Sequence, residues 1–266
     1  MGIAIIGGGN MGKTYAKAFI KEKVLAPEDL FIYFRKKAES ETDYSGLTGN
    51  LCFSPDKHIS GCSVVILAVK PQDFNELSAD LKPYLKAEQL VLSIMAGISI
   101  DQIRSKLSHH KVVRAMPNIP AKIGLGITAF VVPQGADKTT ITEVYALLGT
   151  TGKALQLDDE SLLDAVTALS GSGPAYFYYF VKQLIEAGKQ MGIDENASRR
   201  LVLQTMLGAY HLMEKNDQSL DALIDSVASK DGTTEAALKT FEKEKIGQNV
   251  QDGLFAALQR AKELAI

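Results

Sequence analysis

The 266-residue sequence has few of the residues on which disulfide and metal chemistry depend. Its only two cysteines, Cys52 and Cys62, are too few for a disulfide framework, so we expect a reducing, cytoplasmic location. The four histidines show no metal-ligand spacing, and we expect no metal site. A nucleophile elbow of the form G-x-S-x-G is also missing, which argues against hydrolase chemistry of that type.

Long apolar runs and an excess of one charge are missing as well. No stretch approaches the ~20 apolar residues that a membrane-spanning helix needs. A strand-like apolar run begins at Ile3, so we expect no signal peptide. The formal net charge is −2, from 29 Lys and Arg against 31 Asp and Glu. We therefore expect neither nucleic acid nor a membrane as a partner.

A glycine-rich loop at residues 7–14 is the most informative feature that is present. Gly7, Gly9 and Gly12 fit the G-x-G-x-x-G turn of a dinucleotide-binding βαβ unit. The Gly-Lys-Thr that ends the loop also fits the P-loop, G-x-x-x-x-G-K-[ST]. In both cases small residues let backbone N–H groups approach phosphate oxygens at the start of a helix. A tight turn without a ligand is the third interpretation.

The surroundings of this loop favour the dinucleotide. Residues 3–6 form an apolar run typical of a buried parallel strand, and residues 30–34 form a second strand after a helical spacing. A P-loop protein also needs an acidic magnesium ligand at the end of a later strand. The strands expected at residues 63–69 and 90–94 end without Asp or Glu, so the P-loop is the weaker interpretation.

The residues after the second strand indicate which dinucleotide binds. An NAD site has an acidic residue there, which accepts hydrogen bonds from the ribose hydroxyls. This chain has Arg35, Lys36 and Lys37 instead, with no acid before Glu39. Cations suit the 2′-phosphate of NADP, and Arg35 can hold it through two N–H groups. We predict NADPH as the cofactor, with NADH as a weaker substitute.

The two halves of the chain follow different patterns. Strand-like and helix-like segments alternate through residue 157, as in a Rossmann-type doubly wound parallel sheet, and only helices are expected afterwards. The sequence thus predicts an α/β fold, with a dinucleotide-binding domain at residues 1–157. An all-α domain for substrate binding and oligomerisation should occupy residues 158–266. The expected strands cover residues 3–6, 30–34, 63–69, 90–94, 111–115, 127–132 and 153–157.

Polar, glycine-containing turns at residues 170–175 and 229–234 interrupt the helical half. Each precedes a helix, where hydroxyls and free N–H groups can bind a carboxylate; simple helix capping is the alternative. The helices expected at residues 176–191 and 196–214 are more apolar than one small helical layer would hide. We therefore expect a homo-oligomer formed through this half, with core packing inside the monomer as the alternative.

Six short motifs lie in order along essentially the full length of the chain. They are the opening loop at residues 7–11, AVKPQ at 68–72, SIMAG at 93–97, RAMPNIPA at 114–121, LSGSGPAY at 169–176 and SKDGTT at 229–234. Together they resemble the motifs of the Δ1-pyrroline-5-carboxylate reductase family. One departure is Asp231, where the family has the first glycine of its last loop. The resemblance implies reduction of Δ1-pyrroline-5-carboxylate to L-proline, the last step of proline biosynthesis, by hydride transfer from NADPH to a cyclic imine.

The resemblance also implies roles for individual residues, which must position two rings because the cofactor supplies the chemistry. Thr234 is the catalytic candidate, whose hydroxyl would hydrogen-bond the imine nitrogen. The residues expected to hold the cofactor are Gly7, Gly8, Gly9, Asn10, Met11, Arg35, Lys36, Ala68, Val69, Lys70, Pro71, Ala96 and Gly97. Those expected to bind the substrate are Glu160, Ser226, Ser229, Gly232, Thr233 and Thr234.

Two other functions remain open at this point. A β-hydroxyacid-type dehydrogenase shares the glycine loop and the helical second half, but it needs a Lys with a nearby Asn on the first long helix of that half. Residues 176–192 contain no Asn. The non-enzyme alternative is a regulatory paralogue that binds NADPH without turnover, with Asp231 as the substitution that abolishes activity.

Overall fold

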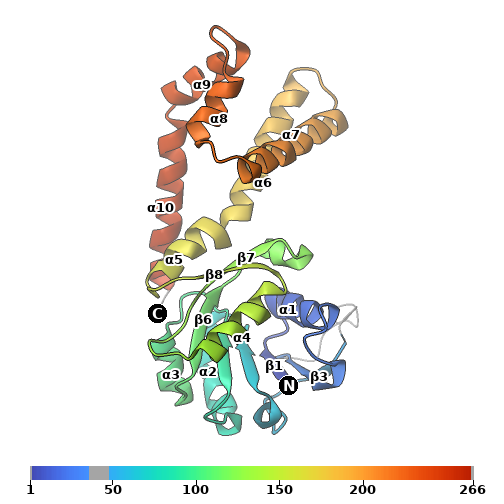
Figure 1. The fold of residues 1–266 in the computed structure, drawn as a ribbon, viewed down its shortest axis with the longest axis vertical. Coiled ribbons are helices and arrows are strands. Elements are labelled where there is room, and N and C mark those ends of the chain that lie inside the picture. Colours follow the sequence, from blue (N-terminus) through green and yellow to red (C-terminus); the bar gives the residue numbers. More distant parts are fainter. Residues whose placement is uncertain (1, 36–47, 265–266) are drawn as a thin grey trace. The chain divides into compact units, whose positions relative to one another are not determined.

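The computed structural model describes residues 2–35 and 48–264 (Figure 1). The chain forms two compact units. The first unit comprises residues 1–172 and 257–266, and the second comprises residues 173–256. No helix in the described ranges combines the length and apolarity required to cross a bilayer.

A sheet of eight strands forms the centre of the first unit, in the order β3-β2-β1-β4-β5-β6-β7-β8. Neighbouring strands are parallel except β6 and β7, which are antiparallel. The chain passes to opposite sides of β1 to form β2 and β4, and ligands of such sheets bind where the strand order reverses. The strands are β1 (Ile3–Ile6), β2 (Leu30–Tyr33), β3 (Asn50–Cys52), β4 (Val64–Leu67), β5 (Leu90–Ser93), β6 (Val112–Met116), β7 (Gly126–Val131) and β8 (Gly152–Gln156).

The predicted Rossmann-type fold is confirmed, and the antiparallel pair is an addition to it. A parallel crossover needs about a dozen residues or more. The link between Met116 and Gly126 is shorter and forms only the 3-10 turn η5 (Ile119–Ile123), so β7 returns alongside β6 in the opposite direction.

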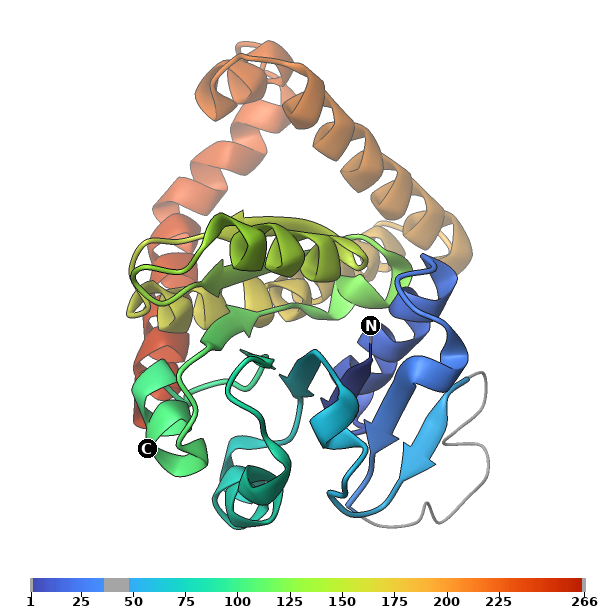
Figure 2. The same cartoon turned by 60° about the horizontal axis from the view of Figure 1, so that its bottom comes forward.

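Helices cover both faces of the sheet (Figure 2). Tyr15 and Phe19 of α1 and Leu147 of α4 pack in one buried cluster, while Phe74 of α2 and Ile103 of α3 pack in the other. Because both faces are covered, β1, β4 and β5 are buried along their whole length. These helices are α1 (Asn10–Lys21), α2 (Pro71–Leu81), α3 (Ile100–Leu107), α4 (Lys138–Gly149) and α5 (Leu162–Val166).

Helices make up the second half of the chain, as predicted. They are α6 (Gly173–Gln190), α7 (Glu195–Lys215), α8 (Leu220–Val227), α9 (Thr233–Lys243) and α10 (Ile246–Leu264). The turn predicted at residues 170–175 is wrong, because a π-helical turn at Thr167–Gly171 leads from α5 almost directly into α6. Pro174 fits there because the N–H groups of a first helical turn need no partner within the helix.

The predicted domain boundary at residue 157 lies next to the end of the sheet, since β8 ends at Gln156. The compact units divide later, at residue 172, because α5 packs against the sheet through the buried Leu163. The assignment of substrate binding and oligomerisation to residues 158–266 stays a prediction.

Candidate functional site

The glycine loop joins the end of β1 to the start of α1, and each of its three motif glycines has a different structural environment. Gly7 has a φ of +117°, and a Cβ there would lie 2.6 Å from the carbonyl carbon of Ala68. A Cβ on Gly12 would collide with the carbonyl oxygen of Gly7. A Cβ on Gly9 would meet no described protein atom within 4 Å. The backbone at Gly9 is therefore open to an external group, at the position where a dinucleotide loop admits the pyrophosphate.

Backbone N–H groups at the start of α1 complete this phosphate cradle. The N–H groups of Gly7 and Gly8 donate to the Tyr33 carbonyl oxygen at 3.0 and 3.1 Å, which fixes the loop against β2. Gly9 is the N-cap residue of α1 and has no side chain to cap the N–H groups that follow. Uncapped N–H groups and the helix dipole favour an anion at this position. The loop therefore fits a dinucleotide.

A cleft of about 480 Å³ lies beside this loop in the first unit. Most of the predicted cofactor residues that the structure describes meet there; Lys36 lies outside the described residues. Those that line the cleft are Gly7, Gly8, Gly9, Arg35, Ala68, Val69 and Lys70. The cleft also has three aromatic walls that the sequence analysis missed, Tyr33, Phe34 and Phe53. The rings of Phe34 and Phe53 are 6.4 Å apart, so they offer an apolar surface beside a polar loop.

Helix α2 contributes acidic side chains to the same cleft. Asp73, Glu76 and Asp80 line it, facing the end of β2. Arg35 Nη1 lies 2.6 Å from Asp73 Oδ1, and Arg35 Nη2 lies 3.8 Å from Glu76 Oε2. A phosphate that binds Arg35 must therefore compete with carboxylates for the guanidinium. The position of these acids follows from the sequence of α2. Phe74, Ser78 and Leu81 are spaced on one face of the helix, and that face is buried.

The remaining predicted cofactor residues lie elsewhere in the first unit. Asn10 lines a different cleft, next to α1, and Met11 packs against the hydrophobic core. Pro71 is the first residue of α2, and Ala96 is half-buried in the loop that follows β5. Gly97, with a φ of +73°, lines a shallow cleft that it shares with Glu160.

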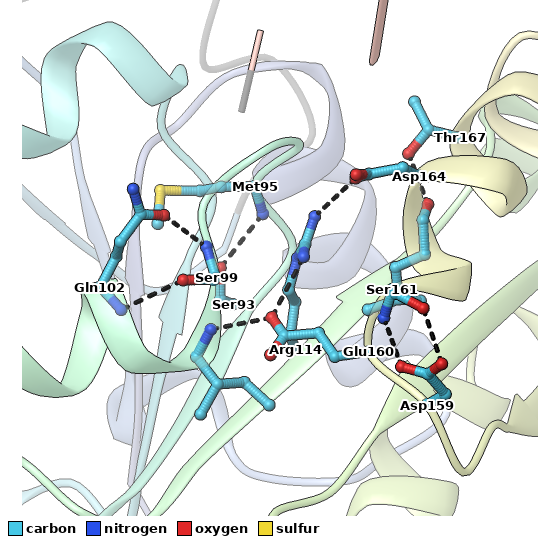
Figure 3. A network of polar contacts seen from close by, with 12 residues as sticks. Ser93, Met95, Ser99, Gln102, Arg114, Asp159, Glu160, Ser161, Asp164 and Thr167 are labelled. Atoms are coloured by element: carbon cyan, nitrogen blue, oxygen red, sulfur yellow. Dashed lines mark hydrogen bonds and ion pairs between the residues drawn. The ribbon is translucent and has the colours of Figure 1, made fainter. Parts of the chain in front are cut away.

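Glu160 belongs to a network of ion pairs around the buried Arg114 (Figure 3). Arg114 Nη1 lies 3.1 Å from Glu160 Oε1, and Arg114 Nη2 lies 3.3 Å from Asp164 Oδ1. Glu160 Oε1 also accepts the N–H of Ile100 at 2.8 Å, in the first turn of α3. A buried guanidinium is costly unless it is paired, so this network ties β6, α3 and the start of α5 together. In the sequence, Arg114 stands out only as part of the motif at residues 114–121.

The predicted substrate loop lies in the second unit, between α8 and α9. Asp231 has a φ of +61°, and its N–H donates to Glu235 Oε2 at 2.7 Å. The N–H of Gly232 donates to the Ser229 carbonyl oxygen at 3.0 Å, and a Cβ on Gly232 would lie 2.9 Å from that oxygen. The loop is therefore a tight turn that leaves Gly232 as the N-cap of α9, without a side-chain cap.

The hydroxyl groups near this turn differ in their surroundings. Thr233 is exposed and Thr234 is half-buried in the first turn of α9. Ser226 lies on α8, where its hydroxyl donates to the Leu223 carbonyl oxygen at 2.7 Å. The structure thus brings Ser229, Gly232, Thr233 and Thr234 together in one turn, with Ser226 one element earlier in the same unit.

The Glu235 carboxylate fixes the conformation of this turn. A hydrogen bond from Lys239, followed by the one from the Asp231 N–H, lowers the pKa of Glu235 below its ordinary value. The carboxylate is therefore charged at neutral pH and holds the backbone of Asp231 in its left-handed conformation.

Comparison with known proteins relates both parts of the chain to reductases. Residues 160–264 match a family described as pyrroline-5-carboxylate reductase dimerisation, and residues 2–97 match one described as NADP oxidoreductase, coenzyme F420-dependent. The pyrroline-5-carboxylate reductase of Haemophilus influenzae is 34% identical over 98% of this chain and 97% of its own length. That of Pseudomonas aeruginosa is 35% identical over 99% of this chain and 96% of its own length. The solved structure of Plasmodium falciparum pyrroline carboxylate reductase with NADP bound has a TM-score of 0.90 and 29% identity, over 100% of this chain and 98% of that one.

Proposed function

The chain belongs to the pyrroline-5-carboxylate reductase family, and we infer that it reduces Δ1-pyrroline-5-carboxylate to L-proline with NADPH. The structural observation that carries the cofactor part is the open space at Gly9, in the same cleft as Arg35. The open backbone at Gly9 leaves room for a pyrophosphate at the start of α1, and the arginine in the same cleft favours a ligand with a further phosphate.

On this proposal the first unit binds and orients the cofactor, which supplies the hydride when bound. The N–H groups at the start of α1 bind the pyrophosphate, and Arg35 with Lys36 binds the 2′-phosphate. Ala68 to Pro71 line the ribose, and Ala96 with Gly97 approaches the nicotinamide ring. These residues follow the carboxyl ends of β1, β2, β4 and β5 in the chain, as expected for a sheet that binds its ligand at the topological switch point.

The second unit supplies the substrate loop. Ser229, Gly232 and Thr233 receive the substrate carboxylate, supported by the uncapped N–H groups at the start of α9. The Thr234 hydroxyl donates to the imine nitrogen. Ser226 of this unit and, in the first unit, Glu160 are the remaining proposed substrate residues; the Glu160 carboxylate accepts hydrogen bonds from Arg114 and from the Ile100 N–H.

Self-association is part of the same proposal, since the dimerisation family matches residues 160–264. We place the subunit contacts on the helical part of the chain. A cytoplasmic location fits the two cysteines, which are free thiols.

The decisive experiment measures NADPH oxidation in the presence of Δ1-pyrroline-5-carboxylate, with a parallel titration of NADPH binding. Turnover that yields proline supports the reductase. Binding of NADPH without turnover would contradict it and favour the regulatory paralogue, and turnover of a β-hydroxyacid in place of the imine would favour the dehydrogenase alternative.

A further inference from the structure

A second cleft in the first unit lies beside α1, and its lining is strongly basic. The cleft has a volume of about 400 Å³ and is lined by Lys13, Lys17 and Lys21 of α1 together with Lys122 of η5. The other lining residues carry no charge; they are Asn10, Thr14, Ala18, Ala121, Ile123, Gly124 and Thr150. Four cations and no carboxylate therefore line one concave surface, in a chain whose net charge is −2.

The four lysines have little local charge compensation. Within the described residues, the ion pair formed by these four lysines is the one between Lys21 and Glu22, at 3.6 Å. Lys13, Lys17 and Lys21 are spaced four residues apart on one helix face, where like charges destabilise a helix. These three lysines lower the stability of α1, and Lys122 adds a fourth positive charge from η5. Such an arrangement indicates an anionic partner.

The same cleft explains why the Gly-Lys-Thr of the P-loop pattern is present without a P-loop. Lys13 lines the lysine cleft and is not among the residues that line the cofactor cleft. The Thr14 hydroxyl donates to the Asn10 carbonyl oxygen at 2.8 Å, inside its own helix. Neither side chain lines the cofactor cleft, and Lys13 is available to the second cleft.

We propose that the lysine cleft binds a polyphosphate chain, either free or as the tail of a nucleoside triphosphate. Lysine ammonium groups bind phosphate oxygens as point charges from several directions, which suits a flexible chain of phosphates. No aromatic side chain lines the cleft, so a base finds no stacking partner and the phosphates provide the recognition. The lining residues lie outside residues 160–264, the range that matches the dimerisation family.

The test is calorimetric titration of the full chain with sodium tripolyphosphate, ATP and adenosine at low salt. The protein is saturated with NADP⁺ beforehand, so that the cofactor cleft is occupied. We expect tripolyphosphate and ATP to bind with similar affinity, adenosine not to bind, and the affinity to fall as sodium chloride is added, because salt screens exposed charges. The Lys17→Gln/Lys122→Gln variant should lower the affinity for both anions by about tenfold or more. The reason is that each hydrogen bond to a charged group contributes about a tenfold change in affinity.

Lys106→Gln is the matched control, because Lys106 is an exposed lysine of α3 in the same unit and does not line the cleft. It should leave anion affinity unchanged, and all these variants should keep the wild-type KM for NADPH. The proposal is overturned if tripolyphosphate does not bind, or if Lys17→Gln/Lys122→Gln binds it as the wild type does. Anion binding that is seen only when NADP⁺ is left out would place the anion in the cofactor cleft, and adenosine binding would show nucleoside recognition; either result also overturns the proposal.

Discussion

At the scale of single residues, Arg35 determines the expected cofactor preference. Its side chain lines the cofactor cleft and is 68% exposed, so it can reach a phosphate. We predict that Arg35→Ala raises the KM for NADPH roughly tenfold or more, because hydrogen bonds to charged groups contribute about 1.5–3 kcal/mol. The KM for NADH should change little, since NADH has no 2′-phosphate. Steady-state kinetics with both cofactors measures this, and equal effects on the two would contradict it.

A substitution of Asp73 is the control, because it should change the KM for NADPH in the opposite direction to Arg35→Ala. Its carboxylate lies 2.6 Å from Arg35 Nη1 and competes with the phosphate for the guanidinium. Asp73→Asn keeps the side-chain shape and removes the charge, so the KM for NADPH should fall while that for NADH stays constant. A rise in the NADPH KM would instead show that Asp73 holds Arg35 in its binding position.

Thr234 is the residue on which the proposed chemistry depends. The basicity of the imine nitrogen increases as hydride adds to the neighbouring carbon, so a hydrogen bond from Thr234 is stronger in the transition state than in the ground state. Thr234→Val keeps the branched shape and removes the donor. We predict a loss of about 1–3 kcal/mol, roughly five- to a hundredfold, mainly in kcat.

Thr233→Val is the control, because its proposed contact uses the backbone N–H. Its kcat should change less than that of Thr234→Val. If Thr234→Val lowers the thermal midpoint and leaves kcat unchanged, the hydroxyl stabilises the start of α9 and has no role in catalysis.

At the scale of elements, the turn before α9 carries a charge that the family pattern lacks. Asp231 adopts a φ of +61°, which glycine favours and which Asp tolerates better than most residues. Its carboxylate lies in the turn proposed to receive the substrate carboxylate. Two like charges ~4 Å apart repel by about 1 kcal/mol in water, so removing one should improve substrate binding.

We predict that Asp231→Gly and Asp231→Asn each lower the KM for Δ1-pyrroline-5-carboxylate by roughly three- to fivefold, with kcat little changed. Initial-rate kinetics at saturating NADPH measures this. Improvement in the glycine variant alone would assign the effect to the backbone, because the asparagine variant removes the charge and keeps the side chain.

The elements also show what the sequence could and could not predict. Seven of the eight strands were predicted, and the clearest signals are the apolar runs of the fully buried strands β1, β4 and β5. Strand β3 has three residues and is largely exposed, so it has no such pattern. Pro71 is a predicted cofactor residue, but the sequence patterns did not predict the helix α2 that begins there, so the acids of α2 that face Arg35 were missed.

Contacts between distant segments were beyond the reach of sequence patterns. Arg114 and Glu160 are 46 residues apart, and neither has a local signal for their ion pair. The position of Glu160 beside α3 follows from the packing of α5 against the sheet, through residues such as Leu163. The tight turn of the glycine loop could be predicted from a motif because its steric constraints lie within a short segment and one neighbouring strand end.

At the scale of the whole molecule, the helices of the second unit expose more apolar surface than an isolated chain should. On α6, Phe177 and Tyr178 are each 64% exposed, and on α7 Leu212 is 62% exposed. Stable interfaces bury ~1,200–2,000 Å², and aromatic residues contribute much of such an area. These residues fall within the region that matches the dimerisation family.

We therefore predict that the protein is an obligate homo-oligomer, at least a dimer, assembled through these helices. Phe177→Glu/Leu212→Glu buries two charges in the expected interface and should shift the sedimenting species to lower mass at micromolar concentration, with loss of activity. Leu125→Glu is the control, because Leu125 is 73% exposed in the first unit, outside residues 160–264. Its mass should match the wild type. A fully active wild-type monomer in sedimentation velocity would contradict the prediction, since the apolar faces of α6 and α7 would then be exposed in the working enzyme.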